Sequence, residues 1–169
     1  MRTVNIQEDI MAELEKFDKN NLEFFQKKIG YTFSDESLLV RALTRHAFGK
    51  EKNLADYDYM DAYATLGDAV IDVVVILRLI ETGNHEKGII TTKKTDLVNM
   101  TRLRNLAESL GLQNYVIWGK GERQQHIWTS GRVLAECMEA VSGAIYLDGG
   151  ITAVKEFLTR VGFFCKKNL

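Results

Sequence analysis

The sequence predicts an all-α protein, and three observations support this fold class. The 169 residues contain no proline, a residue that helix interiors tolerate poorly. Apolar residues recur at helical spacing in several segments along the chain. Two segments, 59–82 and 132–147, are long and apolar enough to form buried helices. We therefore expect shorter helices to pack around these two.

The first part of the chain is predicted to hold three helices. Residues 1–20 are expected to form a helical extension, because apolar residues at helical spacing are interleaved there with acidic ones. A second helix should end at Gly30, and Ser34 is the expected N-cap of a third that continues to Leu43. The charged, irregular segment 49–58 is predicted to be a loop.

The middle of the chain is dominated by segment 59–82. Its β-branched run at 73–76 would also suit a strand, but the length of the segment favours one helix that ends at Gly83. Two further helices are expected, one from about Lys87 and one over 97–110.

The last part of the chain is predicted to be a loop with short structure over 113–131, followed by a strong helix over 132–147. Its apolar stripe is formed by Leu134, Met138, Val141 and Ile145. Two glycines at 149–150 should break this helix before a final one. We place the main domain over 21–165 and a tail over 166–169.

Composition is that of a soluble globular protein. Hydrophobic residues make up 46% and charged residues 27%, and a formal net charge of −1 gives no overall signal for nucleic acid. No signal peptide is expected, and the most apolar run, 69–80, is too short and too charged to span a membrane. Cys137 and Cys165 do not make a disulfide framework, and Cys137 is expected to be a buried free thiol. These features favour a cytoplasmic location.

Three carboxylates are candidates for a functional site. Glu136 and Glu139 are three residues apart, so they project from one face of the predicted helix. The facing helix should be the one that carries Asp68, next to Gly67. Burying carboxylates is costly without a partner, and carboxylate oxygens converging between two helices suit Mg²⁺ or Mn²⁺. The spacing alone is equally typical of a solvated face of an amphipathic helix.

A set of short segments, in order along the chain, carries a more specific signal. They are Ile29–Phe33 with Leu38–Leu39, Ala42–Thr44, Leu66–Val70, Leu97–Asn99, Leu106–Ala107, Gly119–Glu122 and Leu134–Gly150. Together they resemble the ribonuclease III family over most of the chain. The resemblance implies a ribonuclease III endonuclease-domain-like helical bundle that acts as a homodimer. It also implies hydrolysis of double-stranded RNA with Mg²⁺ or Mn²⁺, which leaves 5′-phosphate and 3′-hydroxyl ends.

The resemblance also implies which residues act. The family signature Glu-Arg-Leu-Glu-Phe-Leu-Gly-Asp corresponds to 61–68 here. The implied metal ligands are Asp68 and Glu139, which are also the implied catalytic residues, with Glu136 as an additional ligand and Asp61 as an auxiliary. Two residues depart from the pattern: Ala64 replaces a family carboxylate, and Thr65 replaces a phenylalanine that inserts into the partner subunit. These departures favour an alternative, a catalytically impaired module that binds structured RNA or scaffolds a ribonucleoprotein.

Basic residues in two stretches are candidates for RNA contacts, since double-stranded RNA is recognised mainly through its phosphates and 2′-hydroxyls. They are Lys94, Arg102, Lys120, Arg123 and Arg132. A solvated helix face also explains the first two. The domain is expected here without the double-stranded RNA-binding domain that typical bacterial relatives carry after it. Either the protein lacks that domain or the sequence is a piece of a longer chain.

Overall fold

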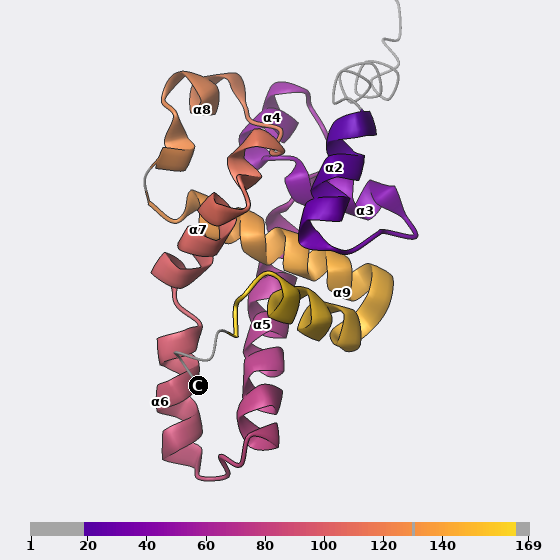
Figure 1. Cartoon of the computed structure of the whole chain (residues 1–169). Helices are drawn as coiled ribbons and strands as arrows, with labels where there is room; N and C mark the ends of the chain where they lie inside the picture. Colours follow the sequence, from indigo (N-terminus) through magenta and orange to yellow (C-terminus); the bar gives the residue numbers. More distant parts are fainter. Residues whose placement is uncertain (1–18, 130, 165–169) are drawn as a thin grey trace, which may run out of the picture.

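The computed structural model describes residues 19–129 and 131–164 (Figure 1). Of the predicted extension over 1–20, only the last two residues are described, and Cys165 and the predicted tail over 166–169 lie outside the described residues. Within the described ranges, every regular element is a helix, and strand-like pairing is limited to one isolated bridge between Thr44 and Ile117. The all-α prediction is confirmed.

Eight α-helices and three short 3-10 helices make up the described part of the chain. The α-helices are α2 (Lys19–Ile29), α3 (Glu36–Leu43), α4 (His46–Glu51), α5 (Asp61–Glu81), α6 (Lys87–Leu97), α7 (Met100–Ser109), α8 (Lys120–Gln124) and α9 (Val133–Arg160). The 3-10 helices are η1 (Asp56–Asp58), η2 (Leu112–Asn114) and η3 (Ile127–Thr129). None of the helices in this part has the length and hydropathy that a membrane span needs.

Helices α5 and α9 form the centre of the fold and cross at close range (Figure 1). A methyl group added to Gly67 of α5 would lie 1.7 Å from the carbonyl oxygen of Glu139 on α9. One added to Gly143 of α9 would lie 2.2 Å from the carbonyl oxygen of Tyr63. The two helices therefore touch backbone to backbone at these glycines. This confirms that the helix carrying Asp68 faces the one carrying the two glutamates.

The apolar core surrounds this crossing. Both predicted buried helices contribute to it, and every member of the predicted apolar stripe on α9 is buried. Shorter helices close the core with large side chains such as Phe25 of α2 and Leu39 of α3. The packing of short helices around two long ones is as predicted.

Helix α9 consists of two segments that meet at Gly150, whose φ of 73° and ψ of −170° are not helical. The second segment turns back toward α5 (Figure 1). The carboxylate of Asp148, just before the turn, accepts hydrogen bonds from the Tyr31 hydroxyl at 2.7 Å and the Ser34 and Asp35 backbone N–H groups at 2.9 and 3.0 Å. The predicted break at the two glycines is thus confirmed.

Three boundaries differ from the sequence prediction. The N-cap of α3 is Asp35 rather than Ser34, because the Asp35 carboxylate accepts a backbone N–H of the first turn. The segment 49–58 is only partly a loop, since α4 runs into its start and η1 lies at its end. Helix α7 begins after Asn99, whose side chain caps it and so separates it from α6.

Candidate metal centre

The crossing of α5 and α9 brings Asp68 and Glu139 into one electrostatic environment. Gly67 contacts the backbone of Glu139, so the neighbouring Asp68 lies at the same level of the crossing. Burial, and then the negative charges of Asp68 and Glu136, raise the pKa of Glu139 to about 7. Arg132 acts in the opposite direction. Asp68 and Glu136 therefore both lie close enough to Glu139 to disfavour its charged form.

These carboxylates are more accessible than expected. Asp68 is exposed, and the side chain of Glu136 is 33% exposed. The reason is helical geometry: Gly67, Val70 and Ile71 of α5 face the core, which turns the intervening Asp68 outward. The expectation of deeply buried carboxylates was wrong for Asp68. A site that opens to solvent is one that a polymer substrate can reach.

Both carboxylate oxygens of Glu136 face arginines. Arg132 Nε lies 3.0 Å from Oε1, and Arg45 Nη1 lies 3.6 Å from Oε2. Across the described ranges, no three histidine, cysteine, aspartate or glutamate side chains gather closely enough to hold a metal ion as they stand. Asp68 and Glu139 are therefore the main candidates for the centre, and at Glu136 a metal would compete with the two arginines.

Arg45 also forms a buried ion pair that the sequence reasoning did not identify. Its Nε and Nη2 donate to Glu122 Oε1 at 3.0 and 2.8 Å, and the two side chains are only 12% and 9% exposed. The other oxygen of Glu122 accepts the Gly119 backbone N–H at the start of α8. Burial would lower the pKa of the Arg45 guanidinium, but its hydrogen bond to Glu122 and the surrounding negative charge raise it above the ordinary value. The sequence signal that could have pointed to Glu122 is the segment Gly119–Glu122, because this segment carries part of the family resemblance.

Asp61, the predicted auxiliary, lies at the exposed start of α5. Its Oδ2 is 2.5 Å from His46 Nδ1, and the imidazole packs against the Tyr59 ring at 4.8 Å between centroids. Asp61 is not among the charges that raise the pKa of Glu139. Ala64, one turn further along, is partly buried against the core and offers no oxygen ligand.

The predicted RNA-contact residues divide into two groups. Lys94 Nζ pairs with Asp72 at 2.6 Å, and the guanidinium of Arg102 donates to the Phe163 carbonyl and lies 5.2 Å from the Phe163 ring centroid. Lys94 therefore connects α6 to α5, and Arg102 connects α7 to the segment that follows α9. The other group lies on exposed positions of α8 and at the start of α9. It consists of Lys120, Arg123 and Arg132.

Other residues singled out from the sequence have structural roles. Cys137 is a free, buried cysteine as predicted, and burial raises its thiol pKa to about 12, so it is neutral and not a nucleophile. Trp118 is buried, donates to the Gln113 carbonyl at 2.9 Å and packs 5.1 Å from the Trp128 ring. These tryptophans serve packing.

Comparisons with known proteins agree with the fold and the motifs. The model of a family described as Ribonuclease-III-like matches residues 35–163. Ribonuclease 3 of Syntrophobacter fumaroxidans is 34% identical over 136 residues, which cover 80% of this chain and 56% of the relative. Ribonuclease 3 of Bacillus cereus is 34% identical over 142 residues, covering 81% and 56%. The chain thus spans little more than half the length of these relatives.

A solved structure is also similar. It is the nuclease domain of ribonuclease III from Campylobacter jejuni, described for its flexibility in a region involved in dimer formation. It superposes with a TM-score of 0.75 at 27% sequence identity, and the match covers 88% of this chain and 98% of that domain.

Proposed function

The chain belongs to the ribonuclease III family, and from this membership we propose that it is a metal-dependent endoribonuclease that hydrolyses double-stranded RNA in RNA processing. The observation that carries the proposal is the like-charged pair of Asp68 and Glu139 at the solvent-accessible crossing of α5 and α9. A carboxyl group whose pKa is raised to about 7 by burial and by neighbouring negative charges is typical of functional sites.

The side chains at the crossing fit a hard divalent cation. Mg²⁺ commonly binds through one or two carboxylates and keeps water and substrate phosphates as its other ligands. Burial is the largest cause of the raised pKa of Glu139 and the charges of Asp68 and Glu136 add to it, and a cation would offset these negative charges. Asp68 and Glu139 would hold Mg²⁺ or Mn²⁺, with Glu136 as an additional ligand and Asp61 as an auxiliary. When bound, such an ion supplies a water of lowered pKa and neutralises charge on the phosphate.

Basic side chains would bind and position the RNA. Lys120 and Arg123 of α8 and Arg132 of α9 are exposed and can neutralise RNA phosphates, which would position the duplex over the carboxylates. Lys94 and Arg102 are weaker candidates, because internal contacts already engage both. Hydrolysis would leave 5′-phosphate and 3′-hydroxyl ends.

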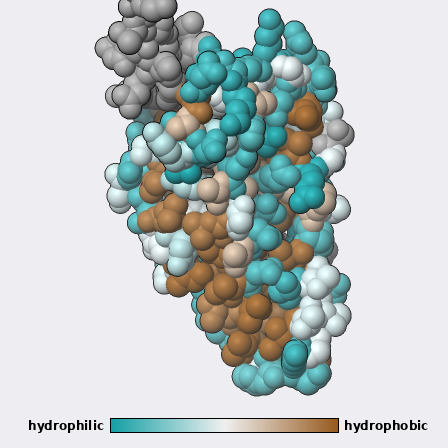
Figure 2. All heavy atoms as spheres, turned by 180° about the vertical axis from the view of Figure 1, so that it is seen from behind, coloured by the Kyte–Doolittle hydropathy of each residue, from teal (hydrophilic) through white to brown (hydrophobic). Residues whose placement is uncertain are grey.

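We also propose a homodimer, so that two sites cut both strands. Figure 2 shows a hydrophobic surface over the lower part of the face seen from behind, where α5 runs. Helix α5 carries three exposed apolar residues, Val73, Leu77 and Ile80, at helical spacing on one side. Leu77→Glu should convert a dimer into a monomer in light scattering, whereas Phe24→Glu on distant α2 should not. A monomeric wild type would contradict the dimer.

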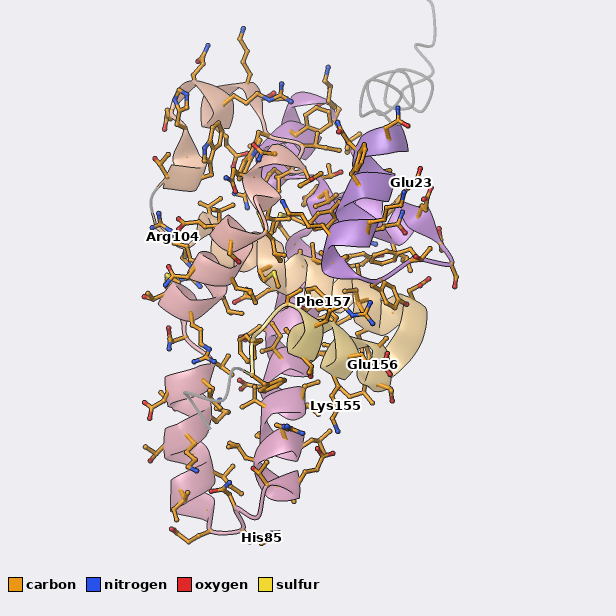
Figure 3. All side chains as sticks on the ribbon, in the orientation of Figure 1. Glu23, His85, Arg104, Lys155, Glu156 and Phe157 are labelled. Carbon is orange, nitrogen blue, oxygen red and sulfur yellow. The ribbon has the colours of Figure 1, made fainter. Side chains whose placement is uncertain are left out.

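The direct test is incubation of the purified protein with long double-stranded RNA and Mg²⁺ or Mn²⁺. Asp68→Asn and Glu139→Gln should each abolish cleavage without loss of folding. Glu156→Gln is the matched control, since Glu156 projects from the far segment of α9 (Figure 3) and should leave cleavage unchanged. Wild-type protein that binds the RNA but cuts it with neither metal would contradict the proposal.

That outcome would favour the second candidate, a catalytically impaired module that binds structured RNA or scaffolds a ribonucleoprotein. Two observations support it. Ala64 supplies no carboxylate at a position where the family has one, and both oxygens of Glu136 face arginines.

A further inference from the structure

Glu136 is contacted by two arginines of very different accessibility. The Arg45 side chain, which faces Oε2, is 12% exposed. The Arg132 side chain, which lies 3.0 Å from Oε1, is 68% exposed. A guanidinium beside a carboxylate oxygen competes with a metal ion for that oxygen, and the two arginines differ in how readily they can leave Glu136.

Arg45 is fixed in place. Its guanidinium is shared between Glu136 and Glu122, lies 3.6 Å from the Met60 sulfur and stands 5.8 Å from the Trp118 ring centroid. Moving it would leave the buried Glu122 carboxylate without its partner, which is strongly unfavourable. Arg45 therefore keeps Oε2 of Glu136 in position.

Arg132 is held weakly. Its contact with Glu136 is an exposed pair four residues apart, a kind of pair that contributes little in water and is screened by salt. Arg132 also occupies the N-cap position of α9, where the helix dipole disfavours a positive charge. An RNA phosphate can bind this guanidinium through two parallel hydrogen bonds and so compete with Glu136 for it.

We propose that Arg132 is a latch on Glu136 that responds to RNA, and that Arg45 is the positioning residue that holds Glu136 when the latch opens. Without RNA, Arg132 occupies Oε1. When a backbone phosphate takes the guanidinium, Oε1 becomes available to the metal centre while Arg45 keeps Oε2. RNA binding and metal binding then strengthen each other, because coupling between two ligands is reciprocal. The inference rests on the proposed function.

The test is calorimetric titration of the purified protein with Mn²⁺ in the absence of RNA. Arg132→Gln should bind Mn²⁺ roughly threefold more tightly than the wild type, the gain expected from losing a weak competing pair. Arg123→Gln is the matched control, because Arg123 is an exposed arginine of α8 without a contact to Glu136 among the described residues. It should leave Mn²⁺ affinity unchanged.

A double-mutant cycle separates the latch from a general effect of charge. In a Glu136→Gln background, Arg132→Gln should no longer tighten Mn²⁺ binding. In cleavage assays, both arginine variants should raise KM for RNA, but only Arg132→Gln should lower the Mg²⁺ concentration for half-maximal rate. A merely structural role would not produce these opposite shifts.

The possible failures are distinguishable. Wild-type protein that binds no Mn²⁺ and cuts no RNA overturns both the proposed function and the latch. Wild-type protein that binds Mn²⁺ and cuts RNA, while Arg132→Gln and Arg123→Gln bind Mn²⁺ equally, overturns the latch alone. So does tightening that persists in the Glu136→Gln background.

Discussion

Two pairs of charged side chains in this protein behave in opposite ways. Arg45 and Glu122 carry opposite charges, are nearly buried and satisfy each other at 2.8 Å. Asp68 and Glu139 carry the same charge and lie where α5 and α9 cross at an accessible surface, and the charge of Asp68 adds to burial in raising the pKa of Glu139. The first pair connects the N-cap residue of α4 to α8. The second costs free energy when Glu139 is ionised, and at neutral pH a bound cation would offset that cost, which is why we assign function to it.

The largest expected change in stability comes from removing one partner of the buried Arg45–Glu122 ion pair. Glu122→Ala leaves the Arg45 guanidinium buried without its main partner, so the free energy of unfolding should fall by about 3–5 kcal/mol. Urea denaturation measures this loss. Glu108→Ala, which removes the partner of Arg104 in an exposed pair, should cost less than about 1 kcal/mol. Equal losses in the two variants would contradict a structural role for the buried pair.

The next largest change in stability should come from separating α5 and α9 at their crossing. Gly67→Ala places a methyl group 1.7 Å from the Glu139 carbonyl oxygen, so the helices must separate at the crossing. We expect a loss of about 3 kcal/mol in unfolding free energy, together with loss of RNA cleavage, because the carboxylates move apart. Gly121→Ala on α8, where the added methyl meets nothing within 4 Å, is the control. A stable, active Gly67→Ala would show that the close crossing is dispensable.

A smaller effect tests the like-charged pair through pH. The folded-state pKa of Glu139 is about 7, above its ordinary value of 4.5, so the folded chain holds this proton more tightly than the unfolded chain. Stability should therefore fall as pH rises from about 4.5 to 7. Glu139→Gln should be more stable than wild type at pH 8, by on the order of 1–2 kcal/mol since the carboxylate is only partly buried.

The same variant should match the wild type near pH 4, where Glu139 is protonated in both states. Thermal unfolding without divalent metal, at both pH values, is the measurement. A stability difference that does not change with pH would mean that the charge of Glu139 is already compensated.

The smallest expected effect is on the Mg²⁺ requirement and comes from restoring a carboxylate at position 64. Ala64→Glu adds an oxygen ligand one turn before Asp68 and should lower the Mg²⁺ concentration for half-maximal cleavage roughly tenfold. Ala62→Glu adds the same charge at an exposed position on a different face of α5 and should have little effect. If the two variants behave alike, position 64 is not part of the centre in this chain.

The two pairs also differ in how well they could be predicted from the sequence alone. Helical periodicity predicted both long helices, and the spacing of Glu136 and Glu139 beside small residues predicted which helix faces Asp68. Arg45 and Glu122 are 77 positions apart and belong to short elements, so no periodic pattern connects them. Burial of Asp68 was overestimated, since its apolar neighbours hide that position 68 points away from the core.

The N-cap residue of α3 also depends on contacts between distant parts of the chain. Ser34 and Asp35 are both good N-caps, and the distant Asp148 takes the backbone N–H groups of both residues. Only the folded chain shows that Asp35 caps α3.

The central claim, that the like-charged pair is a metal centre, is tested most directly by NMR titration of the Glu139 carboxyl with and without Mg²⁺. We expect a titration near pH 7 in the metal-free protein, moved to lower pH both by Mg²⁺ and by Asp68→Asn. A Glu139 carboxyl that titrates near its ordinary value of 4.5 without metal, or one that Mg²⁺ leaves unmoved, would contradict it.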